Sequence, residues 1–271
     1  MIHSGRQTSS LGSIQCDRIV TMGSGDKPIV FLHGLFGTPE HWRFIMNDLC
    51  DDYRVVAPQL PVDKQPNQRW HGIQSIDELV DHVADLMVQL ELPPVVLCGN
   101  SLGGLVSIEI CLRHPDRVAG LVLAGSAGLY ERSLTSGSRP KPSREFVRTV
   151  ASDIFADPNL ITDQMVDDWY EAVLDRDYVR FLLRVSRATR NRRLDDELKR
   201  LNLPTLIVWG REDKVTPPAV AESFRSQIDD AQLKFLDACG HAPNLEQPAA
   251  FTELLRQFLP ECFADESAPS T

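Results

Sequence analysis

The sequence predicts an α/β fold: a mostly parallel, doubly wound sheet with helices on both faces and an inserted helical cap. Two observations lead to this prediction. Apolar strand patterns alternate with helical patterns along the chain, which is typical of a parallel sheet. The alternation breaks between about Ser126 and Leu203, where only helical periodicity returns. At 271 residues, one large domain with an insertion is more natural than two independent domains.

Short apolar runs separated by turn residues predict the strands of the core. These runs are Ile14–Val20, Ile29–Leu32, Arg54–Ala57, Val95–Cys98, Leu121–Ala124, Leu206–Trp209 and Leu233–Leu236. Helical patterns between them cover Pro39–Leu49, Ile76–Leu90, Leu102–Arg113, Pro217–Gln227 and Pro248–Phe258. Pro39 in a first turn and Ser75 before Ile76 are helix start signals. A site is expected where the carboxyl ends of the strands meet.

The predicted organisation has three parts. Residues 13–125 and 204–260 form the core, residues 126–203 form the cap, and residues 1–12 and 261–271 are flexible termini. Within the cap, a turn-rich entry at 137–142 precedes helical spacing of apolar residues such as Phe146, Val150 and Ile154. We expect this cap to lie over the serine described next.

A nucleophile elbow motif lies between a predicted strand and a predicted helix. Residues 99–104 read G-N-S-L-G-G, so that Ser101 falls at the sharp turn and glycines flank it. This arrangement holds a serine in a strained backbone conformation and lets strand and helix approach closely. The alternative, an ordinary turn serine, is disfavoured by the strand-turn-helix context. Ser101 is therefore the candidate nucleophile.

A serine hydroxyl needs a base, and the base needs an orienting carboxylate. Asp213 follows the apolar strand Leu206–Trp209, and His241 follows the strand Leu233–Leu236. The chain order serine, aspartate, histidine is that of one known class of such sites. Glu212 is the neighbouring alternative for the acid, whereas Asp237 is predicted to be a turn residue.

The chain resembles α/β-hydrolases of the single-domain, cap-bearing type over about Ile29 to Leu259. The matching runs are HGLFG at 33–37, GNSLGG at 99–104, HPDRV at 114–118, WGRED at 209–213 and GHAP at 240–243. The resemblance implies that Asp213 is the triad acid. It also implies that the backbone N–H groups of Leu35 and Leu102 form an oxyanion hole, with Phe36 as a substitute for Leu35.

Two groups of cap and loop residues are candidates for substrate binding. Aromatic side chains could line an apolar acyl pocket: Phe36, Trp42, Tyr130 and Trp169. Arginines at 176, 180, 184 and 187 follow helical spacing. The simpler interpretation is that they form a solvated helix face paired with nearby aspartates. The alternative is a docking surface for an acidic substrate or carrier, as in the similar enzymes that demethylate pimeloyl groups on acyl carrier protein.

Composition excludes several other classes of protein. The formal net charge of −10 disfavours nucleic-acid binding, and no stretch is long enough to span a bilayer. The N-terminal residues lack the apolar run of a signal peptide. The six cysteines form no C-x-x-C pair, so neither a metal site nor a redox dithiol is expected. We expect a cytoplasmic protein that needs no cofactor; the oligomeric state stays open.

These observations predict a serine hydrolase that cleaves carboxylic esters of small molecules through an acyl-enzyme. The nearest alternative is a carbon–carbon hydrolase of ring-cleavage products, which are vinylogous 1,5-diketone acids. Against it stand Leu35-Phe36 in place of a glycine-rich loop, Ala242 in place of a tryptophan, and no evident cap arginine for a substrate carboxylate. Lactone or thioester hydrolysis uses the same residues. A non-catalytic ligand receptor on the same scaffold is the alternative from another class.

Overall fold

The computed structural model describes residues 18–62, 73, 75–132 and 142–264. Within these ranges, seven strands form one sheet in the order β1-β3-β2-β4-β5-β6-β7. They are β1 (Ile19–Met22), β2 (Pro28–Leu32), β3 (Arg54–Pro58), β4 (Val95–Asn100), β5 (Val118–Ala124), β6 (Thr205–Gly210) and β7 (Ala231–Leu236). Only β1 pairs antiparallel, with β3, and the remaining pairs are parallel. The predicted fold class is confirmed.

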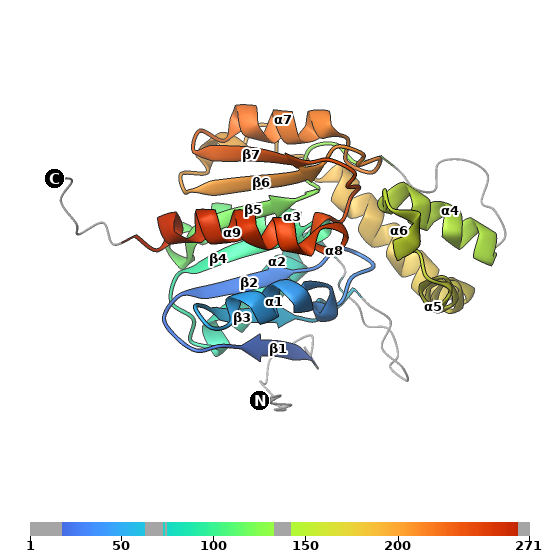
Figure 1. Ribbon diagram of the computed structural model, residues 1–271, viewed down its shortest axis with the longest axis horizontal. Coiled ribbons are helices and arrows are strands. Elements are labelled where there is room, and N and C mark those ends of the chain that lie inside the picture. The colour runs from blue at the N-terminus through green and yellow to red at the C-terminus, as the bar shows by residue number, and fades with distance from the viewer. Residues whose placement is uncertain (1–17, 63–72, 74, 133–141, 265–271) are drawn as a thin grey trace.

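Helices cover both faces of this sheet (Figure 1). On one face lie α1 (Arg43–Leu49) and α9 (Pro248–Cys262), and on the other lie α2 (Ile76–Gln89), α3 (Leu102–Arg113) and α7 (Pro218–Gln227). Strand β4 shows why its run is apolar throughout. Val96 and Cys98 belong to the core beneath α1 and α9, whereas Val95 and Leu97 belong to the core beneath α2 and α3.

A group of helices projects beyond the strand ends on one side of the sheet (Figure 1). Between β5 and β6 the chain forms α4 (Arg144–Ile154), α5 (Asp163–Leu174) and α6 (Arg176–Asn191), with short turns η3 (Pro158–Leu160) and η4 (Leu198–Arg200). Ser143, Thr162 and Asp175 each accept a backbone N–H at the start of one of these helices. We call α4, α5 and α6 the cap helices.

Element boundaries differ from the predictions in a few places. The predicted helix over Pro39–Leu49 is a 3₁₀ turn, η1 (Pro39–Trp42), followed by α1. The first strand, predicted from Ile14, is described only from Ile19 and ends at Met22, and residues 1–17 lie outside the described part. Two short elements, η2 (Pro115–Arg117) and α8 (Pro243–Glu246), were not predicted because each is a single Pro-initiated turn.

The ends of the chain bear on one further prediction. Helix α9 continues to Cys262, so residues 261 and 262 belong to this helix, whereas the prediction placed them in the flexible end. Phe263 packs against Tyr53, with their ring centroids 6.0 Å apart. The predicted flexible segment 1–12 and residues 265–271 lie outside the described part. No helix that the structure describes is both long enough and apolar enough to cross a membrane.

Candidate active site

Ser101 occupies the sharp turn between β4 and α3. Its backbone has φ 55° and ψ −116°. Residues other than glycine rarely adopt a positive φ. Its N–H donates to the carbonyl of Ala124 at 3.0 Å, which fixes the turn to β5. A Cβ on Gly103 would lie 2.1 Å from the carbonyl oxygen of Leu32, so only glycine allows this approach of α3 to β2. The strain predicted for the elbow is present.

Asp213 and His241 form a buried hydrogen-bonded pair. His241 Nδ1 donates to Asp213 Oδ2 at 2.9 Å. The other oxygen, Oδ1, accepts the N–H groups of Val215 and Thr216, both at 2.8 Å. The Thr216 hydroxyl also donates to Oδ2 at 2.8 Å. Four donors around one carboxylate fix its orientation towards the histidine.

This pair changes the proton affinity of the histidine. Burial lowers the pKa of His241, but the charge of Asp213 and its hydrogen bond raise that pKa above the ordinary value overall. Glu131 and Glu246 add smaller raising effects to the pKa of His241. The ring is thereby prepared to accept a proton in a buried place, which is what a base beside a serine must do.

Asn100 and Gly125 bring the histidine loop to the elbow. Asn100 Nδ2 donates to the carbonyl of Ala124 at 2.9 Å and to the carbonyl of His241 at 3.0 Å. A Cβ on Gly125 would lie 2.7 Å from the His241 carbonyl oxygen and 3.1 Å from its Nδ1. The ends of β4, β5, β6 and β7 therefore converge on one place, as the sequence predicts for Ser101, Asp213 and His241.

Glu246 was not among the predicted site residues. Its carboxylate accepts the N–H of Gly240 at 2.8 Å, beside the histidine, and the N–H of Ala156 at 2.7 Å, just after α4. The N–H of His241 in turn donates to the carbonyl of Ile154 at 2.7 Å. These bonds fasten the histidine loop to the end of α4. Little in the sequence indicates this role for Glu246. The one signal is that this acidic residue lies in a short turn that begins at a proline, and such a turn has no solvated helical face on which the side chain could lie.

His33 lies under the loop that follows β2. The N–H of Leu60 donates to His33 Nε2 at 2.9 Å, so the proton resides on Nδ1, which donates to the carbonyl of Gly34 at 2.8 Å. Burial lowers the pKa of His33 to about 4, and the ring is neutral near pH 7. It therefore holds the loop in shape.

The predicted oxyanion donors lie on the two segments that meet at the serine. Leu102 is the residue after Ser101 and the first of α3. Leu35 follows Gly34, where an added Cβ would lie 3.2 Å from the Cβ of Ser101. Both backbone segments thus adjoin the serine, and the positive end of α3 points to the same place. The two N–H groups remain a prediction for the oxyanion hole.

The four predicted substrate-binding aromatics separate into three environments. Phe36 packs on Trp169 of α5, with ring centroids 5.2 Å apart, so the loop after β2 contacts the cap helices. Tyr130 is 51% exposed. Trp42 is fully buried, and its ring packs against Phe31 and Phe251 in the core beneath α1 and α9. That packing corrects the expectation that Trp42 lines a pocket.

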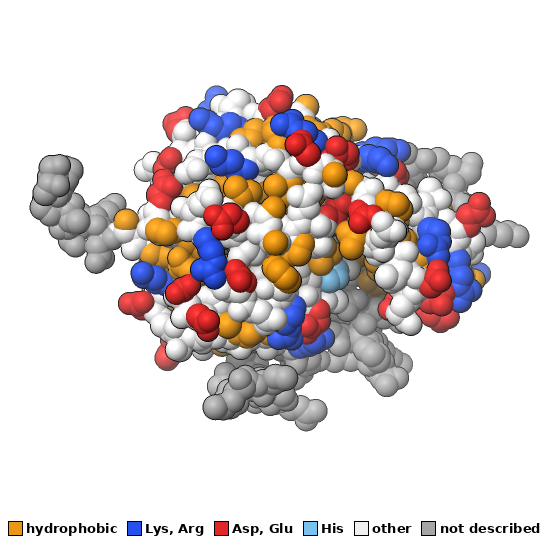
Figure 2. All heavy atoms as spheres, viewed as in Figure 1, with side chains coloured by type: hydrophobic (Ala, Val, Ile, Leu, Met, Phe, Trp, Pro, Cys, Tyr) orange, Lys and Arg blue, Asp and Glu red, His pale blue; other side chains and the backbone are white. Residues whose placement is uncertain are grey.

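Several basic side chains of the cap are paired with neighbouring acids. Arg180 pairs with Asp177, and Arg192 with Glu109 and Glu197. Arg184 donates to the carbonyl of Ile73 at 3.3 Å. Over the cap helices, basic and acidic side chains intermix on the face that Figure 2 shows. These pairs are those expected of a solvated face, and the docking surface for acidic groups stays a prediction.

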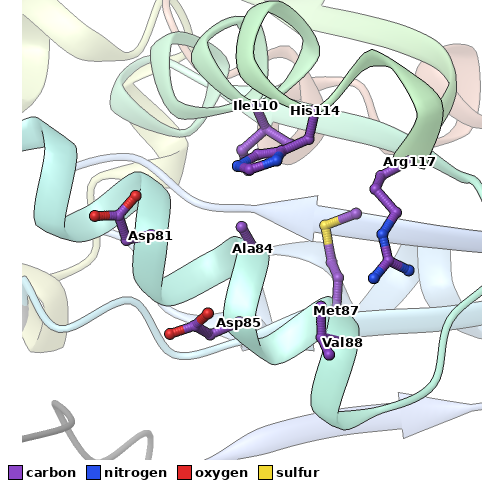
Figure 3. Close-up of a pocket in the computed structure, with 8 residues that line it drawn as sticks. All are labelled: Asp81, Ala84, Asp85, Met87, Val88, Ile110, His114 and Arg117. Carbon is purple, nitrogen blue, oxygen red and sulfur yellow. The ribbon is translucent and has the colours of Figure 1, made fainter. Parts of the chain in front are cut away.

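A separate hollow of about 390 Å³ lies between α2, α3 and η2 (Figure 3). Its lining residues are Asp81, Ala84, Asp85, Met87, Val88, Ile110, His114 and Arg117. None of the residues that surround Ser101 belongs to this lining. Among the described residues, no three or more His, Cys, Asp or Glu side chains lie close enough together to hold a metal ion.

Comparison with known proteins shows which family the chain resembles over its length. Residues 29–254 match the model of the alpha/beta hydrolase family. The chain is 32% identical to a 2-hydroxymuconate semialdehyde hydrolase of Pseudomonas sp. (strain CF600), over 90% of this chain and 89% of that protein. It is 31% identical to a 2-hydroxy-6-oxo-2,4-heptadienoate hydrolase of Pseudomonas putida, over 88% of this chain and 90% of that protein.

A solved structure gives the same result. The meta-cleavage product hydrolase of Pseudomonas fluorescens IP01, complexed with acetates, has a TM-score of 0.76 and 29% identity. The match covers 90% of this chain and 93% of that chain. Family model, relatives and structure agree on the family of the chain. The chain is a hydrolase and belongs to the alpha/beta hydrolase family.

Proposed function

We propose that this protein hydrolyses a carbon–carbon bond in vinylogous 1,5-diketone acids, the products of aromatic ring cleavage. The observation that carries the proposal is similarity above 30% identity, over nearly the whole chain, to two hydrolases whose names state such substrates. The elbow serine and the buried Asp213–His241 pair supply the groups that the reaction needs. Ester hydrolysis, first in order from the sequence alone, becomes the second candidate.

The proposed reaction begins at Ser101. The dienol of the substrate first shifts to its keto form, in which the bond to be broken joins the ketone carbon to a CH2 group that is linked through a carbon–carbon double bond to the second carbonyl group. His241 takes the proton of Ser101 as the serine oxygen attacks the ketone carbonyl, and Asp213 stabilises the imidazolium. The oxyanion would be bound by the N–H groups of Leu35 and Leu102, at roughly 3 kcal/mol per donor in comparable sites.

Breaking the bond releases a dienolate. Its enolate oxygen takes the proton held by His241, and the remaining acyl group stays on Ser101. Water, deprotonated by His241, then hydrolyses this acyl-enzyme. One water is consumed, and the products are a 2-hydroxydienoic acid and a carboxylic acid. No metal or organic cofactor enters this sequence of steps.

Two features of this chain differ from what carbon–carbon hydrolases usually carry, and both favour ester hydrolysis. The loop after His33 carries Leu35 and Phe36, and the histidine is followed by the small Ala242, which is buried. Phe36 and Trp169 present an apolar surface between loop and cap that suits an acyl chain. Lactones and thioesters would react by the same steps. A ligand receptor would bind without repeated turnover.

A side-by-side assay separates these candidates. The wild-type protein is given 2-hydroxy-6-oxo-2,4-heptadienoate and a series of p-nitrophenyl esters from acetate to laurate, with Ser101→Ala as the control. We expect the highest kcat/KM on the dienoate, measured as loss of its ultraviolet absorbance, and none in the variant. Turnover of esters alone would establish the second candidate. Stoichiometric reaction without turnover would indicate a receptor.

A small molecule, rather than a carrier protein, is the proposed partner, because the relatives are named for small-molecule substrates and Arg180 and Arg192 of the cap are already paired with acids. A reducing cytoplasm is the proposed location. Cys50, Cys98, Cys111, Cys239 and Cys262 are all free thiols in the described part of the chain.

A further inference from the structure

One buried carboxylate oxygen beside the candidate active site lacks a partner. Four buried side-chain polar atoms in the described residues have no hydrogen bond: Trp42 Nε1, His82 Nε2, Glu131 Oε2 and Asn244 Oδ1. Glu131 differs from the other three because its carboxylate interacts electrostatically with both His241 and Asp213. A buried acceptor without a donor is costly, so such an atom in a site is explained when a ligand supplies the donor.

The backbone around Glu131 is fastened to both parts of the site. Residues 125–132 run from the end of β5 towards the cap helices. The N–H of Ala127 donates to the carbonyl of Ser101 at 3.1 Å, and the N–H of Arg132 donates to the carbonyl of Val215 at 2.7 Å. The segment that carries Glu131 is therefore bonded at one end to the elbow and at the other to the Asp213 loop.

The surrounding charges leave Glu131 oriented but unpaired. Burial raises the pKa of Glu131, and the nearby His241 and Arg190 partly offset that effect. Arg190 belongs to α6 and donates to the Ser186 hydroxyl at 2.6 Å, not to Glu131. Glu131 thus lies close enough to the histidine and to a cap cation to interact with their charges, and its Oε2 bonds to neither.

We propose that Glu131 is a specificity-determining residue whose Oε2 accepts a hydrogen bond from a hydroxyl on the departing half of the substrate. His241 delivers its proton to the departing fragment, so we expect a carboxyl that interacts with His241 to adjoin that fragment. A hydroxyl fits better than an ammonium group, because Arg190 already places a positive charge nearby. The inference rests on the proposed function, in which the departing half carries a 2-hydroxyl group.

The test compares two ligands in a protein that cannot turn them over. In a Ser101→Ala background, dissociation constants are measured for 2-hydroxy-6-oxo-2,4-heptadienoate and for its 2-methoxy ether, which has no donor. We expect the hydroxyl compound to bind about tenfold more tightly, and Glu131→Leu to reduce this ratio to about one. Because both ligands carry the same carboxylate, any effect of the Glu131 substitution on binding of that group cancels in the ratio of the two dissociation constants.

Two further variants make the result specific. Glu145→Gln removes an exposed acid of α4 and should leave the ratio unchanged. Glu131→Gln retains an acceptor oxygen and should lower the ratio less than leucine does, and it replaces the leucine variant if that protein does not fold. An equal loss of affinity for both ligands would assign Glu131 a structural role and overturn the proposal.

The outcomes also separate this inference from the proposed function. Turnover of the dienoate by the wild type, with a ratio that Glu131→Leu leaves unchanged, would overturn the inference alone. Failure of the wild type to turn over the dienoate, with no binding in the Ser101→Ala background, would overturn both.

Discussion

At the scale of single residues, the Asp213 carboxylate decides how well His241 can act as a base. Asp213 accepts four hydrogen bonds, one of which holds the imidazole through Nδ1. We predict that Asp213→Asn lowers kcat on the order of 10⁴-fold, because an amide favours the wrong histidine tautomer. Steady-state kinetics with a preserved circular dichroism spectrum would measure this. A loss of less than tenfold would show that another group, such as Glu212, orients the histidine.

The raised pKa of His241 sets the acidic limit of activity. The histidine must be neutral to take the serine proton, and Asp213 holds the pKa of His241 above its ordinary value despite burial. The value of kcat/KM should therefore fall as pH decreases through an apparent pKa above 6.5. A pH profile of kcat/KM measures this limit directly. A limit below the ordinary histidine value would mean that burial outweighs the carboxylate.

The same shift has a consequence for stability, and its sign follows from linkage. Because the folded-state pKa of His241 is raised, the folded protein binds a proton more readily than the unfolded chain does. That contribution is fully present below the unfolded pKa and is lost as pH rises through the folded pKa. The histidine that is best prepared for catalysis therefore opposes acid denaturation. His33, whose pKa is lowered to about 4, has the opposite effect between its two pKa values.

At the scale of elements, Glu246 joins the histidine loop to the cap. Replacing it by glutamine keeps the size but removes the charge and turns an amide N–H₂ towards backbone donors. We predict three effects of Glu246→Gln: a higher KM because α4 is released, an acidic limit at lower pH, and a loss of stability of about 1–3 kcal/mol.

Glu253→Gln is the matched control, because Glu253 is an exposed acid of α9 that accepts a hydrogen bond from Gln257 Nε2 at 2.8 Å. Kinetics across pH and urea unfolding of both variants would measure the three effects. A purely structural role for Glu246 would lower stability and leave the acidic limit of kcat/KM where it is in the wild type.

At the scale of the whole molecule, the sequence predicts well those features whose physical cause lies in neighbouring residues of the chain. The buried strands are continuous apolar runs because helices cover both faces, and the elbow glycines are the only residues that permit the turn. The order of Ser101, Asp213 and His241 at strand ends follows from the topology of the sheet.

The features that sequence reasoning missed depend on contacts between distant segments. Glu246 gains its role from the end of α4, 90 residues away, and the unpaired oxygen of Glu131 is recognised only when its surroundings are known. The prediction that Trp42 lines a pocket is wrong because an aromatic residue near a site motif looks the same in sequence whether it packs against Phe251 or against a substrate. Substrate class is likewise a property of the assembled cap and loops.

The central claim is that Ser101 is a nucleophile activated by His241, and covalent trapping tests it most directly. The wild type is treated with an alkyl fluorophosphonate, and the adduct is located by mass spectrometry of peptides. We predict one adduct, on Ser101, with a labelling rate that falls at least about 100-fold in His241→Ala. An adduct on another residue, or a rate unchanged in His241→Ala, would contradict the account.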